Sequence, residues 1–243
     1  MSRPAAARAA VLIPARDEEE ALPRLLEALP GERVDRVLVV DNGSRDATAR
    51  VAREGGAEVV AEPAGGYGMA CRRGLDVLAG LDRPPELVAV VDADDPAAAR
   101  RLGRLLEPLA RGRADLVRGR RRPAAAGERV PLHAALGNAA VSVALRGLWA
   151  APVRDVGPFR AARLEGLLAL GLDDPDYGWN VQMDVRALRA GWRLVEVDVP
   201  HRRRRAGRSK ISGTVLGSLR AGAGMLGTLA RESLAGPAGP AKR

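Results

Sequence analysis

The sequence predicts an α/β fold in which a mostly parallel β-sheet is covered by helices on both faces. Three observations favour this fold class. Short apolar runs alternate with segments of helical character along the first half of the chain. The runs are apolar at almost every position, as in strands buried on both faces. The chain has 243 residues, of which 47% are apolar, so it is long enough to bury a sizeable core.

The first half opens with two strand–helix pairs. Residues 9–13 are Ala, Val, Leu and Ile and predict a strand. Residues 18–29 predict a helix, because Glu residues occupy its first turn and negative charge stabilises a helix N-terminus. Residues 34–40 predict the second strand. The turn-forming residues 41–44 follow, and a second helix is expected from about Asp46.

Three further strands and two helices complete the predicted sheet. The third strand is expected at residues 57–61, and a glycine-rich turn precedes a helix at 67–81. Residues 87–91 predict the fourth strand and residues 97–110 the helix after it. Residues 114–117 predict the fifth strand. Because helices connect consecutive strands, the strands are expected to run parallel.

The pattern changes after residue 118. Residues 118–131 are rich in Arg, Pro and Gly and predict a mobile loop, and residues 153–160 predict a short irregular segment. The remaining expected elements are helices at 132–148, 181–190 and 211–234, a strand at 193–199, a basic loop at 201–210 and a disordered Gly/Pro tail.

The formal net charge of +9 is unevenly distributed. Residues 14–32 are acidic, whereas residues 118–129 and 202–210 are strongly basic. Basic clusters beside an acidic cleft indicate anionic ligands or an anionic membrane surface, although a solvated basic face is the alternative. The aromatic residues are three Trp, two Tyr and one Phe. So few stacking platforms argue against a nucleic-acid partner.

The single cysteine, Cys71, excludes a disulfide within one chain and is consistent with a reducing cytoplasmic location. The N-terminal segment has no long apolar stretch, so no signal peptide is expected. The chain contains no stretch of about 20 uninterrupted apolar residues, so no transmembrane helix is expected.

Asp92 and Asp94 follow the fourth predicted strand and are the first candidates for a site. Residues i and i+2 of an extended chain point the same way, so both carboxylates could aim at one point beyond the strand. Two such carboxylates repel each other unless a cation lies between them, and Mg²⁺ or Mn²⁺ holding a diphosphate would be such a cation. Alternatively the acidic residues form a turn, and Asp95 caps the next helix.

An ordered set of motifs resembles the family 2 glycosyltransferases of the GT-A fold over about residues 9–215. The motifs are Ile-Pro-Ala-Arg-Asp-Glu-Glu at 13–19, Val-Val-Asp-Asn-Gly-Ser at 39–44, Gly-Tyr-Gly at 66–68, Asp-Ala-Asp at 92–94, Asp-Val-Gly-Pro-Phe-Arg at 155–160 and Gly-Arg-Ser-Lys at 207–210. The last two resemble the branch that contains dolichyl- and polyprenyl-phosphate sugar synthases.

The resemblance implies a domain organisation. A GT-A domain with a Rossmann-like, mostly parallel sheet is expected over residues 1–210. Its donor half would cover about 9–118 and its acceptor half about 119–210. Residues 211–243 would form a C-terminal amphipathic helix and a disordered tail.

The resemblance also implies a donor site at the strand ends. Its expected residues are Pro14, Ala15, Asp17, Glu18, Asp41, Gly66, Asp92 and Ala93. For three of them another role is open. Asp17, where the family usually has Asn, could instead cap a helix with Glu20 as partner. Asp41 could be a turn former, and Gly66 could belong to a simple turn that opens a helix.

The metal ligands implied by the resemblance are Asp92 and Asp94, with His201 as a minor option beside its role as a loop residue. Asp155 is the candidate catalytic residue. It would either accept the acceptor's proton or orient an acceptor that is already a phosphate, and a structural turn is its alternative. Gln182 stands where relatives often have Glu, and a neutral amide is no base.

Five residues are expected to contact phosphate or the acceptor. They are Arg121, Arg205, Arg208, Ser209 and Lys210. A solvated basic face, or attraction to anionic lipid, is the alternative for all of them.

The expected function is metal-dependent, inverting transfer of a sugar from a UDP- or GDP-sugar, with a polyprenyl phosphate as the preferred acceptor. Mg²⁺ or Mn²⁺ would be the cofactor. Peripheral contact with the inner face of the cell membrane would bring the enzyme to a lipid acceptor. The alternatives are a sugar-1-phosphate nucleotidyltransferase and a non-catalytic basic binding protein. The first lacks support, because the loop after the first strand is acidic rather than Gly-rich and basic.

Overall fold

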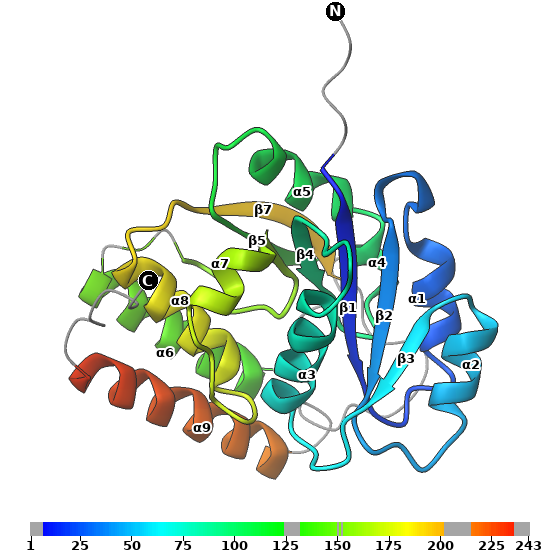
Figure 1. Cartoon of the computed structure of the whole chain (residues 1–243). Helices are drawn as coiled ribbons and strands as arrows, with labels where there is room; N and C mark the ends of the chain where they lie inside the picture. Colours follow the sequence, from blue (N-terminus) through cyan, green and yellow to red (C-terminus); the bar gives the residue numbers. More distant parts are fainter. Residues whose placement is uncertain (1–6, 124–131, 150, 152, 202–214, 236–243) are drawn as a thin grey trace, which may run out of the picture.

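The computed structural model describes residues 7–123, 132–149, 151, 153–201 and 215–235. Seven strands within these ranges form one sheet in the order β3-β2-β1-β4-β6-β5-β7 (Figure 1). The strands are β1 Ala9–Ala15, β2 Arg36–Asp41, β3 Glu58–Ala61, β4 Leu87–Val90, β5 Leu116–Pro123, β6 Arg160–Arg163 and β7 Leu194–His201. Mixed α/β architecture is thereby confirmed.

Most neighbouring strands run parallel, as predicted. The β1 strand pairs in parallel with β2 and β4, β2 with β3, and β5 with β7. The exception is β6, which lies antiparallel between β4 and β5. Its first residue, Arg160, belongs to the segment 153–160 that is expected to be irregular. With four residues and an arginine at each end, this strand lacks the apolar run that marks the others.

The helices cover the sheet and agree with the predicted pattern with two corrections, and one expected loop is corrected as well. They are α1 Leu22–Ala28, α2 Thr48–Glu54, α3 Tyr67–Ala79, α4 Pro96–Ala99, α5 Leu102–Ala110, α6 Leu132–Trp149, α7 Leu164–Ala169, α8 Trp179–Arg189 and α9 Val215–Leu234, with a 3₁₀ turn at Gly31–Arg33. The helix expected at 97–110 is two helices, α4 and α5. The short α7 was not predicted. The expected mobile loop at 118–131 is wrong for its first part, because β5 continues to Pro123.

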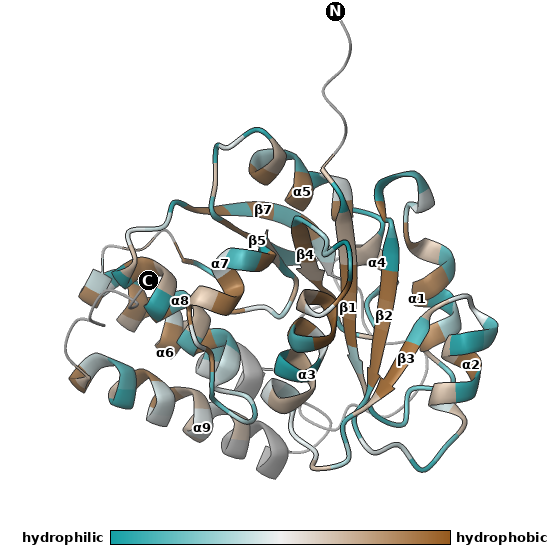
Figure 2. Cartoon of the chain, viewed as in Figure 1, coloured by the Kyte–Doolittle hydropathy of each residue, from teal (hydrophilic) through white to brown (hydrophobic). Residues whose placement is uncertain are grey.

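Two apolar layers lie on opposite faces of the sheet because side chains alternate along each strand. On β1, Val11 and Ile13 pack with α1, α4 and α5, whereas Ala10 and Leu12 pack with α3, α7 and α8. The hydrophobic colouring of β1 and β2 in Figure 2 reflects strands that are buried on both faces.

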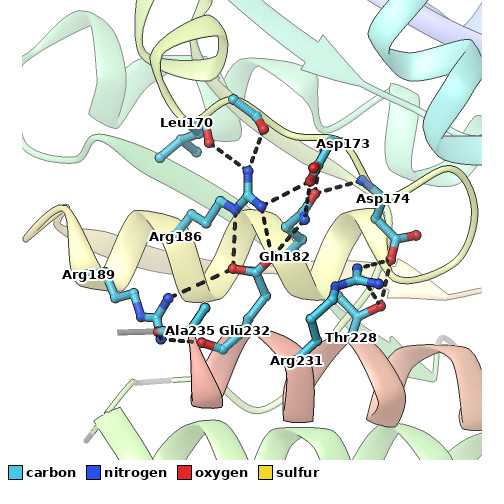
Figure 3. Close-up of polar contacts among 11 residues, drawn as sticks. Leu170, Asp173, Asp174, Gln182, Arg186, Arg189, Thr228, Arg231, Glu232 and Ala235 are labelled. Carbon is cyan, nitrogen blue, oxygen red and sulfur yellow. Dashed lines mark hydrogen bonds and ion pairs between the residues drawn. The ribbon is translucent and has the colours of Figure 1, made fainter. Parts of the chain in front are cut away.

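A third apolar cluster joins α6, α8 and α9 beside the sheet (Figure 1). Leu229 of α9 packs there with Val181 and Val185 of α8. Polar contacts reinforce the same interface (Figure 3): Glu232 of α9 accepts hydrogen bonds from Gln182 and Arg186 of α8. Within the described ranges, no helix combines the length and apolar character needed to cross a membrane.

Candidate functional site

The carboxyl ends of β1 and β2 lie side by side, because Ala15 pairs with Asp41 in the parallel register. Beyond these ends, Asp17 connects the two following loops. Its amide donates to Ser44 Oγ at 2.9 Å, and its Oδ1 accepts from the Arg45 amide at 2.6 Å. Asp17 has a φ of +48°, a conformation that Asp tolerates better than most residues. The helix-capping alternative is wrong, because α1 begins at Leu22, beyond Asp17.

Other predicted donor residues line the same edge of the sheet. The Glu18 amide donates to Thr48 Oγ1 at 2.8 Å, and the Ala15 carbonyl accepts from the Asn42 amide at 2.8 Å. Asp41 Oδ1 accepts from the Ser44 amide at 3.0 Å, so Asp41 does form the turn that was its alternative role. Neighbouring Pro14 pairs with Val40 one position earlier. Nucleotide contact by these residues stays a prediction.

The start of α3 packs against a loop of the second half of the chain. The amides of Tyr67 and Met69 donate to Asp176 Oδ1 at 3.2 Å and to the Pro175 carbonyl at 3.1 Å. Gly66 has a φ of +102°, and a Cβ there would overlap the Pro175 carbonyl oxygen. This glycine is therefore required by packing and backbone conformation, and ligand contact by Gly66 stays a prediction.

The segment that holds Asp92 and Asp94 is a tight turn just beyond β4. The Asp95 amide donates to the Asp92 carbonyl at 3.2 Å, so the extended geometry expected for this pair is wrong. The predicted cap is confirmed, because Asp95 Oδ1 accepts from the Ala98 amide at 2.9 Å and starts α4. Ala93 is buried, whereas Asp92 and Asp94 are half-buried and lie at the same sheet edge as β1 and β2.

Arg121 on β5 and Asp155 form a two-pronged ion pair. The guanidinium donates from Nε to Oδ2 at 2.9 Å and from Nη2 to Oδ1 at 2.7 Å, and the Arg121 amide donates to Oδ2 at 2.8 Å. The backbone around Asp155 is held as well. Its amide donates to Glu196 Oε1 at 3.2 Å, and the Val156 amide donates to Asn138 Oδ1 at 2.7 Å.

Burial opposes the ionisation of Asp155, but the hydrogen bonds and charge of Arg121 outweigh burial and hold the pKa of Asp155 below its ordinary value. Burial also opposes the charge of Arg121, and Asp155 raises the pKa of that guanidinium, with further contributions from Asp92 and Asp95. Strand β6 is antiparallel to both β4 and β5, so β4 and β5 run in the same direction. Arg121, near the carboxyl end of β5, and its partner Asp155 therefore lie at the same sheet edge as the Asp92 turn.

A buried charged network lies beneath this pair and was not anticipated as a unit. Arg118 on β5 and Arg160 on β6 both contact Asp184 of α8, at 3.3 and 3.2 Å. All three side chains are at most 1% exposed. Burial lowers the pKa of Arg160, and Asp184 counteracts that effect. The sequence gives no distinct signal for this network, because β5, β6 and α8 each carry other charged residues.

Asp92 and Asp94 supply carboxylate oxygens, the donors that Mg²⁺ and Mn²⁺ prefer. Among the residues that the structure describes, no group of three or more His, Cys, Asp or Glu side chains is arranged to hold a metal. A cation that bridges to a diphosphate takes further ligands from the phosphate oxygens, so two carboxylates suit such a role. The donor chemistry therefore fits, without a complete cage made of protein side chains.

Several predicted residues cannot be placed at the site. Arg205, Arg208, Ser209 and Lys210 lie outside the described residues. For His201 the structure describes the backbone at the end of β7 but not the side chain. Gln182 lies in the α8–α9 interface instead, where its amide nitrogen donates to Glu232 at 2.7 Å and to Asp173 at 2.6 Å (Figure 3).

Comparisons with known proteins show which family the sequence matches. Residues 10–137 match the model of glycosyl transferase family 2. An uncharacterized glycosyltransferase of Mycobacterium tuberculosis is 46% identical over 209 residues, which are 86% of this chain and 92% of that protein. The undecaprenyl-phosphate mannosyltransferase of Micrococcus luteus is 33% identical over 225 residues, covering 86% of this chain and 90% of that protein.

Among solved structures, glucosyl-3-phosphoglycerate synthase from Mycobacterium tuberculosis has a similar fold. That crystal structure contains Mn²⁺, uridine diphosphate and glucosyl-3-phosphoglycerate. The TM-score is 0.73 at 23% identity, over 94% of this chain and 80% of that chain. The likeness confirms the GT-A architecture that the motifs implied.

Proposed function

Because the chain belongs to glycosyl transferase family 2 and is a glycosyltransferase, we propose that it moves a hexose from a nucleoside-diphosphate sugar to a polyprenyl phosphate. The relative from Micrococcus luteus supports the choice of acceptor, since it is named an undecaprenyl-phosphate mannosyltransferase and matches over most of both chains. Mannose is therefore the first sugar to test, with the donor base open between UDP and GDP.

We assign the donor diphosphate to the turn after β4. Asp92 and Asp94 would hold a divalent cation there, and Mg²⁺ or Mn²⁺ would supply the positive charge that stabilises the departing nucleoside diphosphate. Asp17 keeps the loops after β1 and β2 together at the same sheet edge. In the proposed single displacement, an acceptor oxygen bonds to the anomeric carbon while the bond from that carbon to the diphosphate breaks, with inversion.

The observation that carries the proposed acceptor is the Arg121–Asp155 ion pair, at the same edge of the sheet as the Asp92 turn. A guanidinium in this place can contact an acceptor phosphate, and Asp155 fixes its orientation. Asp155 has a lowered pKa and already accepts three N–H bonds, so it is poorly suited to take a proton. A phosphate acceptor is already anionic near neutral pH and needs no strong base.

A lipid phosphate acceptor also bears on location. The proposed enzyme works in the cytoplasm at the inner face of the membrane, and the basic segments of the chain supply attraction to anionic lipid. Binding to vesicles with and without anionic lipid, followed by sedimentation, tests this part. Equal binding to neutral and anionic vesicles would contradict it.

The donor assignment is tested with a panel of UDP- and GDP-hexoses, with and without Mn²⁺. A correct donor raises the melting temperature in a metal-dependent way, because a ligand that binds only the folded state stabilises it. Asp92→Asn should abolish that shift and the transfer of radiolabelled sugar to undecaprenyl phosphate. Asp82→Asn, on an exposed loop, is the matched control and should keep both.

Two outcomes would point to the alternatives. Unchanged donor binding and transfer in Asp92→Asn and Asp94→Asn would contradict the assignment of a metal–diphosphate site to these residues. That outcome would favour a non-catalytic binding protein. Formation of a nucleotide-sugar from a sugar-1-phosphate and a nucleoside triphosphate would favour the nucleotidyltransferase.

A further inference from the structure

Two buried arginines face each other within the sheet. Arg118 of β5 is paired with Arg160 of β6 in the antiparallel register. Like charges directly opposite each other destabilise a strand pair, and burial makes the repulsion stronger. The carboxylate of Asp184 relieves it, because Oδ2 lies 3.3 Å from Arg118 Nη2 and Oδ1 lies 3.2 Å from Arg160 Nη1. One carboxylate thus holds both guanidinium groups in place.

Both guanidinium groups also donate hydrogen bonds to the backbone around Asp155. Arg118 Nη2 donates to the Asp155 carbonyl at 2.5 Å, and Arg160 Nη2 donates to the Gly157 carbonyl at 2.7 Å. These bonds fix the segment on either side of Val156. Gly157 in turn lies against the ion pair, since a Cβ there would be 3.4 Å from Arg121 Nε and 3.5 Å from Asp155 Oδ2.

We infer that Asp184 is a positioning residue for the acceptor side of the site, an inference that rests on the proposed function. Asp184 holds Arg118 and Arg160, and these hold the 155–157 backbone. That backbone places the Asp155 carboxylate, which orients Arg121 toward the acceptor phosphate. Removing the charge of Asp184 should therefore impair use of the acceptor while leaving binding of the donor at the β1, β2 and β4 ends unchanged.

A matched control separates positioning from a general loss of stability. Glu232 of α9 is also a buried carboxylate that contacts α8, through Arg186 at 2.9 Å (Figure 3). Its carboxylate accepts hydrogen bonds from Gln182 and Arg186, and its backbone carbonyl accepts one from Arg189. None of these bonds leads to the 155–157 segment. Glu232→Gln should lower stability as Asp184→Asn does, but should not change the acceptor step.

The kinetic test compares these variants in sugar transfer. Asp184→Asn should lower kcat/KM for the acceptor by about tenfold or more, with unchanged Mn²⁺-dependent stabilisation by the donor. The double variant Asp184→Asn/Asp155→Asn should be no worse than Asp155→Asn alone, because both changes act through the same carboxylate. Additive losses, an equal acceptor effect in Glu232→Gln, or an equal loss of donor binding would overturn the inference.

A second variant and a second readout keep the test decisive. If Asp184→Asn does not fold, Arg118→Met keeps an unbranched side chain but has no N–H donor for the Asp155 carbonyl, so it should show the same acceptor-specific loss. A normal acceptor step in Arg118→Met would overturn the inference.

Hydrogen exchange measured by mass spectrometry tests the positioning role without depending on enzymatic activity. Asp184→Asn should speed amide exchange in residues 116–122 and 153–160, and Glu232→Gln should not. If the wild type transfers no sugar at all, the proposed function fails. The hydrogen-exchange experiment still tests whether Asp184 positions the 155–157 backbone. Unchanged exchange in the folded Asp184→Asn variant would overturn the positioning role.

Discussion

At the residue scale, Asp155 has its hydrogen-bonding capacity largely committed to Arg121. Three N–H groups of that one arginine contact the two carboxylate oxygens. A carboxylate in this state stabilises and orients a cation rather than accepting protons. This state of Asp155 supports the proposed phosphate acceptor, which arrives already charged.

The lowered pKa of Asp155 predicts how stability depends on pH. A group whose folded pKa lies below its unfolded value contributes stability above the unfolded pKa, about 3.9 for Asp, and loses it as the pH falls through the folded pKa. Asp155→Asn should therefore reduce the free energy of unfolding by about 3 kcal/mol at both pH 7 and pH 5. The difference from wild type should shrink below about pH 4, as measured by urea denaturation. A constant difference down to pH 3 would contradict the assignment.

Arg121→Lys tests the two-pronged geometry. Lysine keeps the positive charge but cannot form the paired hydrogen bonds to Asp155 or to a phosphate. Charge-assisted hydrogen bonds contribute about 1.5–3 kcal/mol, so kcat/KM for the acceptor should fall by about tenfold or more. Arg122→Lys, on the exposed neighbour that contacts Asp198, should have little effect. An equal loss in both variants would show that only general basicity matters.

The motifs predict site roles for Arg121 and Asp155 individually, and those roles stay predictions. Their pairing does not follow from the motifs, because it joins positions 34 residues apart in the chain. Asp41 was expected to contact a base, and the structure shows that it also forms its turn. The partners of such carboxylates depend on which N–H groups lie within hydrogen-bonding distance in the folded chain. Local sequence patterns do not determine those distances.

At the scale of elements, the start of α3 is constrained by the loop at 173–176. A Cβ at Gly68 would overlap the carbonyl oxygen of Asp174, and backbone atoms cannot move aside easily. Gly68→Ala should therefore lower the free energy of unfolding by about 1–3 kcal/mol.

The matched control for Gly68→Ala is Gly137→Ala in α6, where a Cβ would meet nothing within 4 Å. Alanine favours helices over glycine, so this variant should gain about 0.5–1 kcal/mol. Chemical denaturation of both variants measures the difference. Equal effects would contradict the packing argument.

The positions of strands are predictable from the sequence where the run of apolar residues is long. The strands β1, β2 and β4 lie within two residues of their expected ends. The helix after the Asp92 turn was predicted as one, whereas the structure breaks it between Ala99 and Leu102. The short elements β6 and α7 were missed, because four to six residues carry too little periodicity and tertiary pairing decides their state.

At the scale of the whole molecule, α9 is packed as part of the fold. Leu229 is 6% exposed in the apolar cluster with α6 and α8, whereas Leu234 at the end of the same helix is 87% exposed. Leu229→Ala should cost about 2–5 kcal/mol of unfolding free energy, and Leu234→Ala almost none. Thermal denaturation of the two variants is the measurement. Equal stability would mean that α9 is detached from the α6–α8 surface in solution.

The overall architecture followed from the sequence because the alternation of buried strands and helices extends over the first 110 residues. The division into a donor half and an acceptor half stays a prediction. What the pattern could not foresee is the reversal at β6, which lets Arg160 enter the sheet beside Arg118. That reversal depends on pairing between distant segments rather than on local composition.

The burial of Cys71 has a practical consequence for labelling the molecule. It is the only cysteine in the chain, and desolvation raises the pKa of its thiol far above the usual range. Thiolate is the reactive form, so maleimides and other alkylating reagents should spare the native protein. A cysteine introduced at an exposed position such as Leu234 would then be the single point of attachment for a fluorophore or spin label. Such a probe could follow α9 while substrates bind, with no need to remove a native thiol first.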